Sequence, residues 1–210
     1  SPVTVTLSNG ATLTIASGTF SASVSVAAAG DDAYIDAGSV SASIASVSGG
    51  NFEVLAIDPA VATTAITDTL NMTTLDLTAS ASVVEGGTVT YTASVNQNVT
   101  GSPLLVSLSN GLAISIPVGA SSASVSLAAA DDVYAGGNSL VVTVTGTSGA
   151  NYENLVVGNG AAGNPVVTTV TDDADATTVS LSASGSVAEG GSILYTASLD
   201  HPAGAPVTVT

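Results

Sequence analysis

The chain repeats its own sequence, and this repetition is the strongest constraint on its fold. The segment TVTLSNGATLTI, which begins at Thr4, returns as LVSLSNGLAISI at Leu105. In the same way, VVEGGTVTYTASV from Val83 returns as VAEGGSILYTASL from Val187. The offsets give a period of about 104 residues, which is too long for a solenoid coil and suits one globular β-domain. The chain therefore contains about two such repeats.

Apolar and small polar residues alternate through most of the chain, as in residues 3–7, 89–93 and 140–144. A period of two with β-branched residues, interrupted by Asn-Gly, Gly-Gly and Ser-Gly turns, is typical of strands joined by hairpins. No segment has a convincing helical pattern. We therefore predict an all-β protein of tandem, immunoglobulin-like β-sandwiches. An ice-binding solenoid, which Thr-rich runs such as TVT would allow, conflicts with the long period.

The repeat boundaries predict three parts. Residues 1–70 form a partial repeat that lacks its first strands, residues 71–173 a complete repeat, and residues 174–210 the first strands of a further repeat. Either the chain is cut from a longer array, or its end strands complete another copy head to tail, as in donor-strand assembly. Because Pro2–Thr6 and Pro206–Thr210 are the same PVTVT strand, exchanged strands would compete for one position, which favours the array.

The charge of the chain restricts its partners. The sequence has no Lys or Arg and sixteen Asp plus Glu, so its formal net charge is -16. Such a chain cannot neutralise phosphates, and we expect neither nucleic acid nor an anionic membrane surface as a partner. Cations are the natural counterpart. The 45% of hydrophobic residues are enough for a buried core, and no apolar run has the length of a membrane span.

Catalysis is not expected from this composition. The single histidine, His201, precedes a proline in a predicted loop, and the chain has no Cys, Lys or Arg. It therefore lacks an activated thiol, a Schiff-base amine and a fixed cation for a transition state. Composition alone does not exclude a glycosidase pair of carboxylates, but the Asp pairs adjoin each other in loops without an aromatic platform for a sugar. A lectin-like module remains an alternative, although it would need a pocket that only one repeat possesses.

The direction of successive strands predicts that three acidic segments of the complete repeat meet at one pole. Counting the strands places the turn with Glu85, the loop with Asp131 and Asp132, and the strand end with Asp172 and Asp173 together. Crowded carboxylates without basic partners repel one another unless a cation is bound. Oxygen ligands in this number favour calcium (Ca2+) over zinc or magnesium. Alternatively, each Asp only shapes a turn by bonding its own backbone.

Further acidic residues stand at matching positions in the other repeats. Two more, Asp76 and Asp175, lie just past the repeat boundaries and either complete sites or are solvated. We therefore extend the predicted calcium ligands to the first repeat and to the third, incomplete one: Asp31, Asp32, Asp36 and Asp68 in the first, and Glu189 in the third.

The runs VVEGGTVTYTASV, AAADDVY and TVTDDAD, in this order, resemble the immunoglobulin-like repeats of giant Lap-type, RTX-secreted adhesins of Gram-negative bacteria. More distantly, VxEGG followed by Asp-Asp-x-Tyr and a terminal Asp cluster is similar to Calx-β domains. Gly137 or Asn138 stands where that pattern usually has a further Glu. The likeness spans the chain and implies an extracellular, calcium-binding extender at the bacterial cell surface.

The function implied by the resemblance is cell adhesion and biofilm formation within a surface fibre. Its partners would be neighbouring repeats of the same protein and, in a fibre, other copies of the chain. The connections Thr69–Thr73 and Asp173–Thr177 are short and lack flexible Gly/Ser sequences. Calcium bound beside them would therefore stiffen the array.

Overall fold

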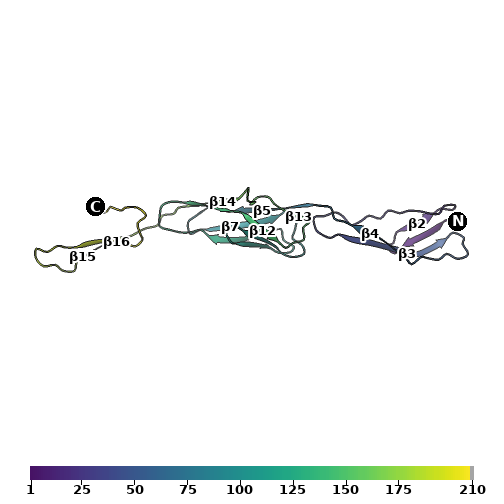
Figure 1. Ribbon diagram of the computed structural model, residues 1–210, viewed down its shortest axis with the longest axis horizontal. Helices are drawn as coiled ribbons and strands as arrows, with labels where there is room; N and C mark the ends of the chain where they lie inside the picture. The colour runs from purple at the N-terminus through teal and green to yellow at the C-terminus, as the bar shows by residue number, and fades with distance from the viewer. Residues whose placement is uncertain (209–210) are drawn as a thin grey trace. The chain divides into compact units, whose positions relative to one another are not determined.

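The computed structural model describes residues 1–208, and every regular element in this range is a β-strand (Figure 1). The predicted all-β class is confirmed. The last two residues of the predicted strand Pro206–Thr210 lie outside the described range. None of the described segments is a helix that could cross a membrane. The chain divides into two compact units: unit 1 contains Ser1–Thr73 and Asn151–Asn154, and unit 2 contains Thr74–Ala150 and Leu155–Thr210.

The strands of the complete repeat form two layers. Their bounds are β5 (Met72–Ala79), β6 (Ser82–Val84), β7 (Thr88–Val95), β8 (Leu104–Leu108), β9 (Ala113–Ile116), β10 (Ser122–Ala128), β11 (Asn138–Val142), β12 (Val144–Ser148), β13 (Asn154–Val157) and β14 (Val166–Thr171). One layer is the sheet β10-β7-β5-β13. The other contains the sheets β11-β14-β6 and β12-β8-β9. Because only Thr143 separates β11 from β12, these two sheets are continuous along the chain.

Alternate side chains of these strands fill the space between the layers. In β7, Val89, Tyr91 and Ala93 are buried, while the residues between them are partly exposed. Leu77 in β5 and Leu108 in β8 are buried in the same alternating pattern. Successive residues of a strand point to opposite faces, so the period of two in the sequence becomes one buried and one solvated face.

Unit 1 has one four-stranded sheet in the order β2-β1-β3-β4. Its strands are β1 (Val3–Leu7), β2 (Thr12–Ile15), β3 (Gly38–Gly49) and β4 (Val61–Ile66). In sequence they correspond to β8, β9, β11 with β12, and β14, which form a single layer of the complete repeat. Residues 21–27 correspond to β10 but form no strand. In the complete repeat β10 pairs with β7, and the described part of unit 1 contains no counterpart of β7.

Residues after 174 form a hairpin of β15 (Val179–Ala183) and β16 (Tyr195–Leu199). These strands are the counterparts of β5 and β7, and almost all of their residues are exposed. The turn within the hairpin matches the turn before β7. The N–H of Gly191 donates to the carbonyl of Ala188 at 2.9 Å, as that of Gly87 does to Val84 at 3.0 Å. The Glu-Gly-Gly turn is therefore encoded locally and forms without a second layer.

Candidate metal centre

The parallel pairing of β6 with β14 brings Glu85 to the end of β14. Val84 lies opposite Thr171, and the N–H of Glu85 donates to the carbonyl of Thr171 at 2.9 Å. Parallel strands run in the same direction, so the residues that follow the two strands lie at one edge of the sheet. Glu85, which follows β6, therefore lies beside Asp172 and Asp173, which follow β14.

The Glu-Gly-Gly turn brings the Asp131 loop to the same edge. The N–H of Ala129 donates to the carbonyl of Gly87 at 2.8 Å, and the N–H of Gly86 donates to that of Ala130 at 3.4 Å. Gly86 has a φ of 67°, in the left-handed region that glycine adopts without steric cost. These backbone contacts place the glutamate of the turn next to the Asp-Asp loop.

Three carboxylates meet closely at this edge. Glu85, Asp131 and Asp173 each place one oxygen within 4.8 Å of the others, and no other set of three in residues 1–208 does so. Glu85 is only 6% exposed, whereas both aspartates are exposed. Its Oε2 atom is buried without a hydrogen-bond partner in the described part of the chain. A buried, unpaired carboxylate oxygen is costly, and a bound cation would remove that cost.

The other two predicted ligands, Asp132 and Asp172, lie around this set. Oδ1 of Asp132 accepts a hydrogen bond from the N–H of Tyr134 at 2.8 Å, which is the turn-forming role open to any Asp. Both residues line a small hollow of about 160 Å³ together with Asp173 and Asp175. They add negative charge beside the three carboxylates.

Two carboxyl groups at this edge, those of Glu85 and Asp175, have raised pKa values. The pKa of Glu85 is raised above the ordinary glutamate value, first by burial and then by the negative charges of Asp132 and Asp172. The pKa of Asp175 is raised, chiefly by the charge of Asp173. The sequence has no Lys or Arg to compensate these charges. A cation would favour the ionised forms of both groups.

The structure shows close protein contacts at Asp76 and Gly137, two positions whose roles the sequence did not decide. Oδ1 of Asp76 accepts a hydrogen bond from the N–H of Asn159 at 2.7 Å, so this carboxylate has a protein donor. A Cβ added at Gly137 would lie 2.3 Å from the carbonyl oxygen of Val170. This close approach to β14 requires glycine, and a glutamate of the Calx-β pattern would collide there.

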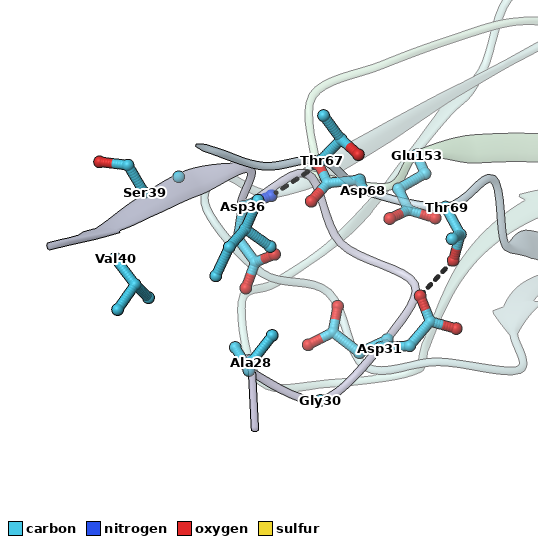
Figure 2. Close-up of a pocket in the computed structure, with 14 residues that line it drawn as sticks. Ala28, Gly30, Asp31, Asp36, Ser39, Val40, Thr67, Asp68, Thr69 and Glu153 are labelled. Carbon is cyan, nitrogen blue, oxygen red and sulfur yellow. Dashed lines mark hydrogen bonds between the residues drawn. The ribbon is translucent and has the colours of Figure 1, made fainter. Parts of the chain in front are cut away.

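The predicted ligands of unit 1 line a hollow of about 440 Å³ (Figure 2). The carboxylate of Asp31 accepts hydrogen bonds from the hydroxyl of Thr69 and, at 2.9 Å, from the side-chain amide of Asn71. These donors lower the pKa of Asp31, the Thr69 hydroxyl most of all. Asp31 is therefore stabilised as an anion by protein groups.

Two other acids of unit 1, Asp32 and Asp68, accept hydrogen bonds from backbone N–H groups. Oδ1 of Asp32 accepts a hydrogen bond from the N–H of Tyr34 at 2.8 Å. Oδ2 of Asp68 accepts one from the N–H of Asp36 at 3.1 Å, as Figure 2 shows. The pKa of Asp36 is raised, first by the charge of Asp32. These four acids form no set of three carboxylates as close as that around Glu85 within residues 1–208.

The predicted ligand of the third repeat, Glu189, is exposed in the loop between β15 and β16. It belongs to no close set of carboxylates among the described residues. Within residues 174–208, the hairpin has the Glu-Gly-Gly turn without an Asp-Asp loop beside it.

The sequence reasoning missed the residues that distinguish the units. Aligning TDTLNMTT from Thr67 with TDDADATT from Thr171 places Thr69 at the position of Asp173 and Asn71 at that of Asp175. Hydrogen-bond donors in unit 1 thus replace carboxylates in unit 2. This alignment was available in the sequence, but its meaning depends on the contact with Asp31.

The structure defines an all-β protein of tandem repeats, in which the complete repeat is a two-layer β-sandwich with an acidic edge. The chain belongs to the LapA domain family, whose model matches residues 1–69, 71–173 and 175–210. Membership supports a Lap-type adhesin at a coarse level, and with it an adhesin-related role at the cell surface or outside the cell. No curated protein and no solved structure matches the chain.

Proposed function

We propose that the chain is a calcium-stiffened extender segment of an RTX-secreted cell-surface adhesin that serves biofilm formation. The main support is Oε2 of Glu85, which is buried without a partner beside Asp131 and Asp173. Calcium takes about six to eight oxygen ligands from carboxylates, carbonyls and water. Asp132 and Asp172 are near enough to this edge to contribute charge, and backbone carbonyls or water would complete the coordination.

Calcium at this edge would join three segments that are distant in sequence: the turn after β6, the loop after β10 and the end of β14. Asp173 also begins the connection Asp173–Thr177, which leads to the hairpin. Binding at Asp173 would order the start of that connection and reduce its freedom to bend. The role is mechanical, without catalysis, and its partners are neighbouring repeats and, in a fibre, other copies of the chain.

Thermal unfolding of the whole chain in about 5 mM calcium chloride and in EGTA tests the proposal. At the affinities typical of extracellular calcium modules, this concentration stabilises the folded state by about 1 to 2 kcal/mol. We expect a higher melting temperature in calcium. Glu85→Gln should lose most of the response, because the substitution removes the anionic ligand and retains its size.

Glu189→Gln is the matched control, because Glu189 occupies the same Glu-Gly-Gly turn without acidic neighbours. It should keep the full response to calcium. Identical melting of the unmodified chain in the two buffers would contradict the calcium proposal and leave the aspartates as turn formers.

A further inference from the structure

Unit 1 includes the segment Asn151–Asn154, which follows β12 in the complete repeat. This segment bridges to the loop that carries Asp31. The N–H of Ile35 donates to the carbonyl of Asn151 at 3.0 Å, and the N–H of Glu153 donates to that of Ala33 at 3.1 Å. The side-chain amide of Asn151 adds a third bond, to the carbonyl of Ile35 at 2.8 Å.

Two aromatic rings lie at the centre of this bridge. Tyr34 and Tyr152 are opposite each other in an antiparallel bridge, and their rings stack with centroids 5.7 Å apart. Tyr152 is only 9% exposed, and Ala33 beside it is buried. Stacked rings of this kind contribute beyond the area that they bury. The contact therefore has the hydrogen bonds and the buried aromatic anchor of a docking site.

Protein donors also satisfy the two carboxylates at this contact. Thr69 and Asn71 donate to Asp31, as Figure 2 shows for Thr69. The backbone N–H of Asn71 donates to Oε2 of Glu153 at 2.6 Å, and its side-chain amide also donates to the carbonyl of Asp32 at 2.7 Å. Asn71 thus connects both sides of the contact, and both carboxylates accept hydrogen bonds from neutral protein donors.

We propose that this contact is a cation-independent docking site, by which the Asn-Tyr-Glu loop of one repeat binds the Asp-Asp-x-Tyr loop of the repeat before it. We call it the clasp; its members are Ala33, Tyr34, Ile35, Asp31, Thr69, Asn71 and Asn151–Glu153. On this assignment Asp31 is held by hydrogen-bond donors and is not a calcium ligand. The contrast with unit 2, where Asp173 and Asp175 replace those donors, rests on the proposed function.

The chain contains internal controls for both halves of the clasp. Asn51-Phe52-Glu53 matches the docking loop in sequence, but Phe52 is 63% exposed. The Tyr134 loop matches the receiving loop, and its tyrosine hydroxyl donates to the carbonyl of Pro202 at 2.9 Å. Within residues 1–208, the amides of Glu53 and Ala135 make none of the backbone bonds that Glu153 and Ile35 make.

Amide hydrogen exchange of the whole chain in EGTA tests the clasp. We expect the amides of Ile35 and Glu153 to exchange at least about tenfold more slowly than those of Ala135 and Glu53, because only the first pair is bonded across a docked contact. Tyr152→Ala should abolish the slow exchange at both sites. Tyr152→Phe retains the aromatic ring and should preserve the slow exchange. Tyr134→Ala is the matched control and should leave the slow exchange at Ile35 and Glu153 unchanged.

Fast exchange at Ile35 and Glu153 in EGTA, or slow exchange only after calcium is added, would overturn the clasp. A second variant, Thr69→Asp with Asn71→Asp, gives unit 1 the acids of unit 2. We expect it to lose the slow exchange in EGTA, since the donors to Asp31 are gone. Unchanged slow exchange in this variant would also overturn the proposal. Because these exchange rates are measured without calcium, their outcome does not depend on whether the site at Glu85 binds calcium.

Discussion

Asp31 in unit 1 and Asp131 in unit 2 occupy the same position in the repeat, but different groups approach their carboxylates. Asp31 accepts hydrogen bonds from Thr69 and Asn71, and its pKa is lowered. Asp131 faces the buried Glu85, whose pKa is raised. The Asp-Asp-x-Tyr sequence therefore does not by itself define a cation site, since the residues that approach it decide between hydrogen bonds and metal.

The units also differ in what supports these loops. Leu108 in β8 is buried between two layers, whereas its counterpart Leu7 in β1 is partly exposed in a unit with one sheet. The acidic edge of unit 2 therefore stands on a packed sandwich. The contacts of unit 1 depend more on hydrogen bonds and on the stacked tyrosines.

The largest expected effect follows from this difference in support. Leu108→Ala should destabilise unit 2 by about 2 to 5 kcal/mol, because it leaves a cavity in a closed core. Leu7→Ala removes the same atoms from a partly solvated site and should cost clearly less. Urea unfolding of both variants, followed by hydrogen exchange in each unit, measures the contrast. Equal losses in the two units would show that Leu7 and Leu108 are packed alike.

The next effect concerns the metal. Asp131→Asn should remove most of the calcium-dependent stabilisation of about 1 to 2 kcal/mol, because it withdraws an anionic ligand. Asp31→Asn should leave that response unchanged, since Thr69 and Asn71 already occupy the carboxylate of Asp31. The melting temperatures of both variants in calcium and in EGTA test this prediction. A similar loss in each would show that Asp31 and Asp131 bind calcium alike.

Much of this arrangement could be predicted from the sequence. The alternation around Val89 and Tyr91 indicated strands with one buried face, and strand directions placed Glu85 with Asp131 and Asp173. The parallel pairing of β6 with β14 and the burial of Oε2 could not be predicted, because they depend on contacts between residues far apart in the chain.

The contacts of unit 1 were the least predictable. Glu153 matches Glu53 in the repeat pattern, but this equivalence did not indicate which loop Glu153 would meet. The structure places it with Asn71 and the loop of Asp31. A repeat pattern shows that two positions are equivalent, whereas the change from Asp173 to Thr69 becomes informative only when the contact partner is known.

The smallest expected effect is a pair of opposite pH dependences in the metal-free chain. The pKa of Glu85 is raised in the folded state, so its contribution to stability is present at low pH and is lost as the pH rises through that raised value. The pKa of Asp31 is lowered, so its contribution is present above the ordinary aspartate range and is lost as the pH falls through the lowered value.

Each pH dependence is isolated by subtracting the free energy of unfolding of a variant from that of the unmodified chain. The stability of the unmodified chain minus that of Glu85→Gln should increase on mild acidification from neutral pH, and the same difference for Asp31→Asn should decrease on stronger acidification. Calcium should reverse the first trend, because protons compete with the metal for Glu85. Chemical unfolding across this pH range, with exchange measured in each unit, resolves the two signs. If both differences changed in the same direction, the two acids would have similar surroundings in solution, and the contrast between donors and carboxylates around Asp31 and Asp131 would be wrong.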